Sequence, residues 1–302
     1  METFTKTLVS FNNISLIQFE TLEDEGFPFK PAGPAIEKEG LIIKEFQEEG
    51  VVSKLLAINS TADFLLLTDM DILKGAKQNR VVNTSVLIAP NSKSELDVSC
   101  VEKYRWTYTS PSFKMSPQAM DFNLRSAKAS KISNRISGVT GEENLQSRVW
   151  NMINDQVTES RMENRTQDYE KYLESERKKN WSERQIQPEK SCNGLAVMMN
   201  KQIVTCDLFG NRDVFRHYFP KLKDAALMYE MPAKKDKPVE QAEAFYKLDE
   251  FLDLAEKDFK PSDEHVAGMG KIRRIKNEDI PGFELSYNGQ MIHLAAFSKT
   301  QE

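Results

Sequence analysis

Long polar side chains follow a glycine in one short segment, just before a predicted strand. Two cations and three amides lie beside Gly75: Lys77, Gln78, Asn79, Arg80 and Asn83. Arginine binds anionic oxygens through a planar fork and lysine through a point charge, while amides both donate and accept hydrogen bonds. Gly75 allows the backbone to approach a ligand closely or to turn with positive φ. The segment predicts an anion site; the alternative is a polar turn in which Arg80 pairs with a carboxylate.

A second polar cluster ends the next predicted strand. Side-chain alternation puts Val98, Cys100 and Glu102 on one face of that strand. A glutamate at the end of an apolar row is costly to bury unless a cation pairs with it or a pocket opens beside it. Arg105 and Trp106 follow directly. This cluster therefore suits either an ion pair or the wall of a site for a planar, charged ligand.

We predict that the two segments meet in one ligand-binding pocket. Its residues are Lys77, Gln78, Arg80, Asn83, Glu102, Arg105 and Trp106, with Trp106 in the wall. The alternative is a structural ion pair between Glu102 and an arginine, which needs no ligand. The sequence identifies no catalytic residue with a defined role. Its candidates for catalysis are Glu102, Asp71 and His293.

Histidine spacing does not indicate a metal centre. His217, His265 and His293 form neither a His-x-His nor a His-Glu-x-x-His pattern, so we predict no metal site. Asp69 and Asp71 share a strand face and could hold Mg²⁺ or act as acid and base, but a solvated turn is the simpler interpretation. No motif identifies a cofactor.

Composition limits the class of partner. The 302 residues carry a net charge of −5 and a pI near 5.5, which argues against a general nucleic-acid binder. The three cysteines form no Cys-x-x-Cys pair and are expected to be reduced thiols. We see no signal peptide and no apolar run of the roughly 20 residues that a membrane span needs. We therefore expect a cytoplasmic protein with no membrane contact and undetermined protein partners.

Apolar alternation and turn residues predict the secondary structure. Residues 1–110 are mainly β, with short runs about ten residues apart that are typical of a sandwich or barrel-like sheet. Residues 111–141 show little periodicity and are expected to be irregular, and the pattern of residues 142–184 predicts one long helix. Residues 191–302 alternate between helices and hairpins, with hairpin turns at Asn200-Lys201 and Asn288-Gly289. We predict residues 1–302 to form a single α+β domain, in which an N-terminal antiparallel β-sandwich-like half packs with a C-terminal helical and β-hairpin half.

The two polar motifs also resemble a known family. The runs Asp71-x-x-x-Gly75-Ala76-Lys77-Gln78-Asn79-Arg80-Val81-Val82-Asn83 and Val98-Ser99-Cys100-Val101-Glu102-x-x-Arg105-Trp106 resemble the ARG-and-rhodanese-phosphatase-superfamily-associated protein domain. The similarity extends from about Gly40 to Phe297. Weaker landmarks are Gln146 with Trp150, Asp207 with Phe209, and His293 with Phe297. Met70 stands where the family pattern has a glycine before the acidic residue.

The resemblance implies a place in the metabolism of NAD-derived, ADP-ribose-like compounds. That family has no established activity, and its name reflects association with ADP-ribosylglycohydrolases and phosphatase-like proteins. Lys77 and Arg80 would suit a pyrophosphate, Trp106 or Tyr104 a base, and Glu102 ribose hydroxyls. The expected ligand is therefore a small phosphorylated molecule. Whether the chain is an enzyme, a non-catalytic binding or regulatory protein, or a scaffold stays open at this point.

Overall fold

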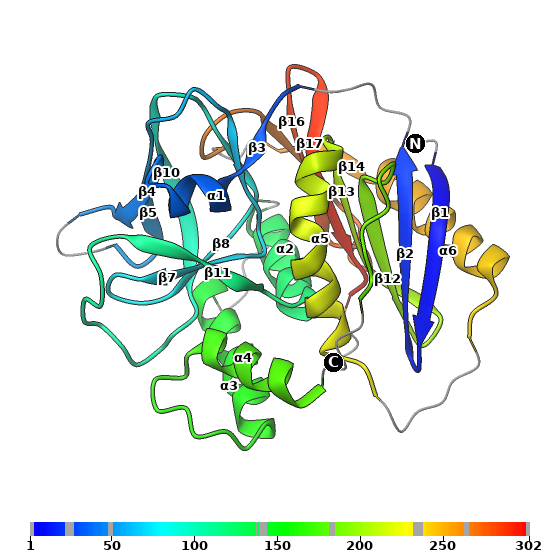
Figure 1. The fold of residues 1–302 in the computed structure, drawn as a ribbon, viewed down its shortest axis with the longest axis horizontal. Helices are drawn as coiled ribbons and strands as arrows, with labels where there is room; N and C mark the ends of the chain where they lie inside the picture. Colours follow the sequence, from blue (N-terminus) through cyan, green and yellow to red (C-terminus); the bar gives the residue numbers. More distant parts are fainter. Residues whose placement is uncertain are drawn as a thin grey trace.

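The computed structural model describes residues 3–21, 27–47, 51–136, 138, 144–180, 185–231, 238–262 and 266–299. The described residues form both helices and mainly antiparallel sheets, which confirms the predicted α+β class. One pair of described strands, β3 and β6, is parallel. Two sheet-containing halves stand side by side, with helices between and around them (Figure 1).

The first half contains a six-stranded and a three-stranded sheet. The larger has the order β11-β7-β8-β10-β5-β4 and the smaller β3-β6-β9. Apolar side chains of both sheets and of helix α1 form one buried cluster. The bounds are β3 (Lys30–Pro31), α1 (Ala32–Glu37), β4 (Leu41–Glu45), β5 (Lys54–Asn59), β6 (Leu65–Leu67), β7 (Asp71–Gly75), β8 (Arg80–Val82), β9 (Val86–Ile88), β10 (Ser92–Cys100) and β11 (Phe113–Ala119).

The second half is an eight-stranded antiparallel sheet. Its order is β1-β2-β12-β13-β17-β16-β15-β14, so the N-terminal hairpin pairs with strands from the last third of the chain. The predicted hairpin turns at residues 200–201 and 288–289 are present. The bounds are β1 (Thr3–Phe11), β2 (Ile14–Thr21), β12 (Gly194–Met199), β13 (Gln202–Phe209), β14 (Phe259–Pro261), β15 (Lys271–Ile275), β16 (Gly282–Tyr287) and β17 (Gln290–Phe297).

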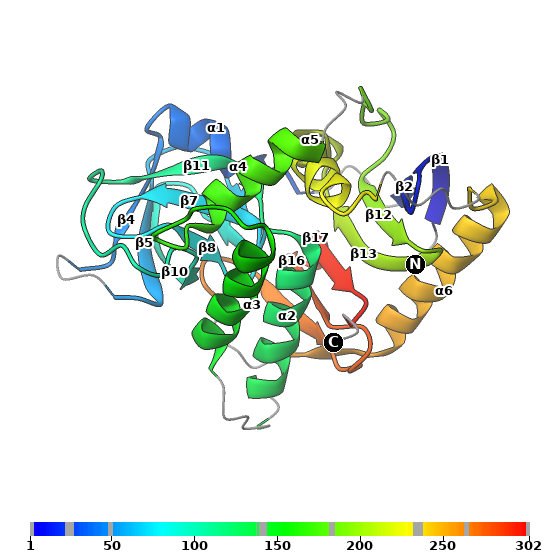
Figure 2. The ribbon, with the colours of Figure 1, turned by 90° about the horizontal axis from the view of Figure 1, so that it is seen from below.

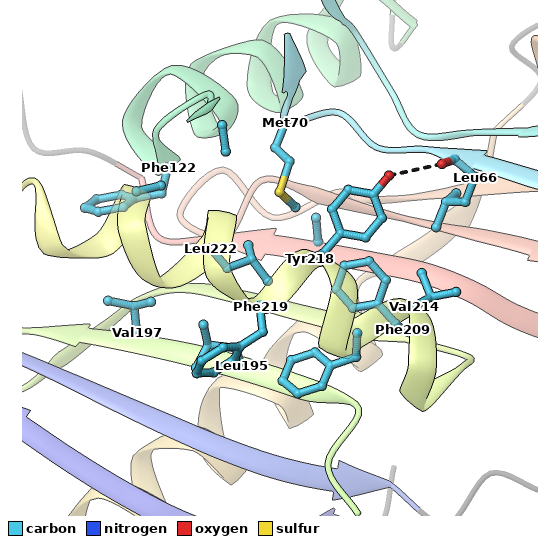
Figure 3. Packing of buried hydrophobic residues seen from close by; sticks show 14 of the residues in the cluster. Leu66, Met70, Phe122, Leu195, Val197, Phe209, Val214, Tyr218, Phe219 and Leu222 are labelled. Atoms are coloured by element: carbon cyan, nitrogen blue, oxygen red, sulfur yellow. Dashed lines mark hydrogen bonds between the residues drawn. The ribbon is translucent and has the colours of Figure 1, made fainter. Parts of the chain in front are cut away.

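Two helices cover opposite faces of the eight-stranded sheet. Helix α5 (Arg212–Leu227) is capped by the side chain of Asn211 and packs through Phe215 and Phe219 into one apolar cluster. Helix α6 (Gln241–Lys257) belongs to a second cluster, which contains the residues of the sheet's other face. Helix α5 also reaches the first half, because Tyr218 donates a hydrogen bond to the carbonyl of Leu66 (Figure 3).

Three further helices pack with strands of the first half, and the first of them also contacts β16 and β17 of the second half. Helices α2 (Phe122–Ile136) and α3 (Leu145–Glu159) lie side by side, and α4 (Tyr169–Asn180) follows (Figure 2). The prediction that residues 111–141 are irregular was wrong, because β11 and α2 occupy most of this segment. The predicted long helix is divided in two at residues 160–168, and its last residues, 181–184, lie outside the described part.

The sequence did not indicate helix α2 because the buried side of this helix is partly charged. Arg125 and Lys128 are 2% and 1% exposed and stand where a periodicity search expects apolar residues. None of the described helices is both long and apolar enough to cross a membrane.

Arg125 joins the two halves through a buried ionic contact. Its guanidinium donates to both carboxylate oxygens of Asp69, in the turn between β6 and β7, at 2.9 Å. It also donates to both oxygens of Asp207, on β13, at 3.0 and 2.5 Å. Burial alone would raise the pKa of Asp207, but Arg125 and then His293 outweigh it and lower this pKa to about 2. Asp207 therefore stays ionised, and the two carboxylates share one cation.

Replacing Arg125 with leucine should strongly destabilise the chain. The change leaves two carboxylates buried without their cation, which typically costs about 3–5 kcal/mol of unfolding free energy. Urea denaturation measures the loss. Arg165→Leu is the matched control, because the Arg165–Glu163 pair is solvated, with side chains 89% and 79% exposed, and should cost at most about 1 kcal/mol. Equal effects of the two changes would contradict the assigned role.

Candidate functional site

Arg105 ties the turn after β7 to the loop after β10. Its guanidinium donates to Glu102 Oε2 at 2.7 Å, to the carbonyl of Ala76 at 2.7 Å and to Asn79 Oδ1 at 3.2 Å. Glu102 also accepts a hydrogen bond from the backbone of Asn79. The ion pair considered as an alternative in the sequence is therefore present, and most donors of Arg105 are used inside the protein.

The turn itself depends on Gly75. Its φ is +122°, and a Cβ there would lie 2.3 Å from Ser110 Oγ. A larger residue would therefore meet both backbone strain and a steric clash. The sequence motif around Gly75 thus encodes a tight, internally bonded turn.

Arg80 lies entirely inside the protein. Its Nη1 donates to Gln78 Oε1 at 3.0 Å, and its Nη2 is 4.0 Å from Glu45 Oε2. Nε and Nη2 have no hydrogen-bond partner among the described residues. Burial lowers the pKa of Arg80 and, against the attraction of Arg80, raises the pKa of the neighbouring Cys100 thiol to about 11. Cys100 is therefore a neutral thiol at neutral pH.

Trp106 forms part of a surface with a lysine and a tyrosine. Lys77 Nζ is 5.4 Å from the ring centre of Trp106 and 5.1 Å from that of Tyr108. The two aromatic residues are 44% and 52% exposed. We call Lys77, Trp106 and Tyr108 the aromatic surface. Six of the predicted site residues therefore gather at or just beneath one surface: Lys77, Gln78, Arg80, Glu102, Arg105 and Trp106.

The other predicted residues lie elsewhere. Asn83 accepts a hydrogen bond from Ser99 and lines a separate cleft. Asp71 accepts from Lys221 Nζ at 2.8 Å and from the hydroxyl of Tyr218 at 2.9 Å. Burial would raise the pKa of Asp71, but Lys221 outweighs burial and the pKa is lowered. Asp71 is thus a buried, fully bonded carboxylate that anchors α5.

His293 is fully buried at the junction of the two halves. Its Nδ1 lies 2.8 Å from Ser85 Oγ, and its Nε2 lies 3.3 Å from Asp207 Oδ1. The ring of Phe209 packs against the imidazole with a centroid distance of 4.5 Å. The third candidate for catalysis therefore sits in a bonded chain of side chains, close to the Arg125 contact.

A cleft of about 920 Å³ opens between the two halves. Its lining comes from β5, β10, β15 and the loop after β8, with α2 and the start of α3. Such a volume suits a drug-sized or cofactor-sized ligand. The polar lining includes Lys131, Arg135, Arg274, Asn83, Thr84, Ser85, Ser99 and Asn144, and the apolar lining includes Val86, Val98, Ile132, Leu145 and Ile272.

Positive charge dominates this cleft. Among the described residues of the lining one is acidic, Asp97, and it pairs with Lys54 at 2.9 Å. Three further cations, Lys131, Arg135 and Arg274, give the lining a net positive charge. The first residues of α3 also face the cleft, and a helix N-terminus favours anions. The cleft therefore suits an anionic ligand within an acidic protein.

The family model of the ARG and Rhodanese-Phosphatase-superfamily-associated Protein domain matches residues 5–297. The chain belongs to this family. No curated protein and no solved structure matches it. The match covers both halves, so the cleft lies wholly within the family domain. The family has no established function, and the match itself carries neither an activity nor a ligand.

The spacing of two cleft cations is visible in the sequence, but the predicted site did not include these residues. Lys131 and Arg135 are four residues apart, which puts them on one face of α2. That spacing has meaning only on a helix, and the segment was expected to be irregular. Asp207 and His293 stand out as family landmarks, but nothing in the sequence shows that they share a hydrogen bond with each other.

Asp69, Asp207 and His293 also form a group whose ligand atoms lie within 4.8 Å of one another. That spacing would suit a metal ion. However, Arg125 donates to both carboxylates, so a guanidinium already supplies the positive charge there. Lys128 adds a second amine, which donates to the carbonyls of Asp69 at 2.7 Å and Val82 at 2.6 Å. Burial lowers the pKa of Lys128 to about 7.

Stability should rise with pH because of Lys128. Its pKa is about 7 in the folded chain and near 10.5 when unfolded, so between these values the unfolded chain binds more protons. The unfolding free energy of the wild type should therefore gain up to about 1.4 kcal/mol per pH unit across pH 7–10 relative to Lys128→Met. Chemical denaturation of both proteins measures this difference, and parallel pH profiles would contradict it.

Arg105→Lys should loosen the turn after β7 while keeping the charge. Lysine cannot reproduce the planar fork that holds Glu102, Ala76 and Asn79 together. Loss of two hydrogen bonds costs about 1–3 kcal/mol, so backbone amide exchange at residues 75–79 should be about tenfold faster or more. Lys44→Arg, at an exposed position on β4, is the control. Unchanged exchange would show that the turn does not depend on Arg105.

Proposed function

We propose that the chain binds a small phosphorylated molecule, of nucleotide or ADP-ribose type, in the cleft between its two halves. The observation that carries this proposal is the excess of cations in the lining, namely Lys131, Arg135 and Arg274. Arginine and lysine side chains form charge-assisted hydrogen bonds with phosphate oxygens, and these are among the stronger contacts available to a protein. This local excess of positive charge stands out against the net negative charge of the chain.

The remainder of the lining supports a ligand that is only partly charged. Val86, Val98 and Ile272 offer an apolar wall for a base or sugar ring. Ser99 and Asn83 bond to each other and can also meet ligand hydroxyls.

Arg274 is held in place before a ligand arrives. The residue is 2% exposed, and its guanidinium donates to Thr84 Oγ1 at 2.7 Å. A preorganised cation loses little entropy on binding. This arginine therefore supports the assignment of the ligand's anionic part to its end of the cleft.

The aromatic surface is a second candidate location for the same ligand. Exposed Trp106 and Tyr108 flank Lys77, and aromatic faces stack on nucleobases without regard to sequence. In this alternative the chain would act as a non-catalytic binding, regulatory or scaffold protein. The geometry favours the cleft, because of the two arginines near the aromatic surface Arg105 is bonded inside the protein and Arg80 is fully buried.

A thermal-shift panel tests the proposal directly. It should include NAD, ADP-ribose, linear and cyclic nucleotides, and sugar phosphates. A ligand at about 100 times its Kd stabilises a protein by about 2.7 kcal/mol. The double variant Lys131→Ala/Arg135→Ala should weaken binding by about tenfold or more for each charge-assisted hydrogen bond that it removes. Lys44→Ala/Lys260→Ala removes two exposed lysines elsewhere and should bind like the wild type.

The outcomes separate the two locations. A shift that weakens only in the cleft variant supports the cleft. A shift that weakens only in Trp106→Ala, with the cleft variant unaffected, would move the ligand to the aromatic surface. No shift with any compound in the panel would overturn the proposed ligand class.

A further inference from the structure

A hydroxyl from the lining of the cleft, an imidazole and a carboxylate lie in series. Ser85 Oγ is 2.8 Å from His293 Nδ1, and His293 Nε2 is 3.3 Å from Asp207 Oδ1. All three residues are at most 1% exposed, and Ser85 belongs to the cleft lining. They come from the loop after β8, from β17 and from β13, so the docking of the two halves is what assembles them.

Neighbouring groups assign the protons along this series. Asp207 is an ionised acceptor, so a neutral imidazole carries its hydrogen on Nε2, which leaves Nδ1 as an acceptor. The backbone N–H of Asp69 donates to Ser85 Oγ at 3.0 Å, so the Ser85 hydroxyl hydrogen is available to point at Nδ1. With the imidazole neutral, all of these bonds are satisfied when Nδ1 accepts from the Ser85 hydroxyl, and the imidazole is then placed to take a proton from Ser85.

The imidazole is also fixed in orientation. The rings of Phe209 and Phe283 lie 4.5 and 5.9 Å from the ring of His293. Arg125 donates hydrogen bonds to both carboxylate oxygens of Asp207 and so holds in place the carboxylate that faces His293 Nε2. A base that is oriented by a carboxylate and bonded to a hydroxyl is the general arrangement of an activated serine.

We propose that Ser85 is a nucleophile toward a phosphoryl group held in the cleft, with His293 as its base. The inference deepens the proposed function, because it rests on the phosphorylated ligand assigned to the same cleft. Asp207 is a positioning residue in this scheme. Arg274, bonded to the neighbouring Thr84, is the cation placed to meet the anionic oxygens of the phosphoryl group.

The reaction balances in two steps. The Oγ of Ser85 bonds to phosphorus while the bond from phosphorus to the leaving oxygen breaks. The hydroxyl proton passes to Nδ1 of His293 and then to the leaving oxygen, which departs as an alcohol or a phosphate. Water then attacks the phosphoserine. Its oxygen bonds to phosphorus while the bond from phosphorus to Oγ breaks, and a proton of the water passes through Nδ1 of His293 to Oγ. The net reaction is hydrolysis, with no oxidant or reductant.

A fluorophosphonate probe tests this without any knowledge of the natural ligand. An activated serine displaces fluoride from the probe and keeps the phosphonyl group. The folded wild type should form one adduct, which peptide mass mapping places on Ser85, and urea-unfolded protein should form none. The adduct should be lost in Ser85→Ala and kept in Ser116→Ala, a matched buried serine on β11 that bonds to Glu170.

Each outcome decides the proposal. An adduct mapped to Ser85 in the wild type supports it even if Ser85→Ala does not fold, which circular dichroism would show. No adduct on Ser85, or labelling that persists in a folded Ser85→Ala variant, overturns it. A thermal shift without labelling would leave the cleft as a binding site with no serine chemistry. Labelling without any thermal shift would keep the nucleophile and remove the proposed ligand class.

Discussion

The contact of Arg125 with two carboxylates is the interaction on which the rest of the arrangement depends. Removing a guanidinium and two carboxylates from water is costly, and the attraction among them offsets that cost only when their geometry is good. Here Asp69 comes from the first half and Asp207 from the second, while Arg125 comes from the helix between them. The contact therefore fixes not only a local bond but the relative position of two sheets. The cleft and the Ser85–His293 contact exist only in that position.

The same contact explains why the sequence predicted the sheets better than the helix between them. The hairpins at residues 200–201 and 288–289 follow local turn chemistry, which can be seen in one segment at a time. Helix α2 buries Arg125 and Lys128, so its polar pattern resembles a solvated segment. A buried charge is stable only with partners distant in sequence, and a single segment carries no record of them.

The candidate site, too, could be predicted from the sequence only in part. The motifs around Gly75 and Glu102 were visible, and six of their residues do come together, because one turn and one loop hold them. The sequence did not show what the cations of these motifs bind. Whether an arginine donates to a ligand or to the protein's own carbonyls depends on the path of the neighbouring backbone. Strand β8 links the two regions, since Arg80 begins it and Asn83, just beyond its end, lines the cleft.

The pairing of the N-terminal hairpin with β12 has a consequence for synthesis of the chain on the ribosome. Strand β2 is almost wholly buried in the finished sheet, and its partner strand begins only at Gly194. At about 5–20 residues per second, the ribosome takes on the order of ten to forty seconds to reach that partner. Throughout this interval β2 presents an apolar, unpaired edge of the kind that nascent chains use to aggregate. The order in which the strands emerge makes the nascent chain a natural client for chaperones that shield such edges.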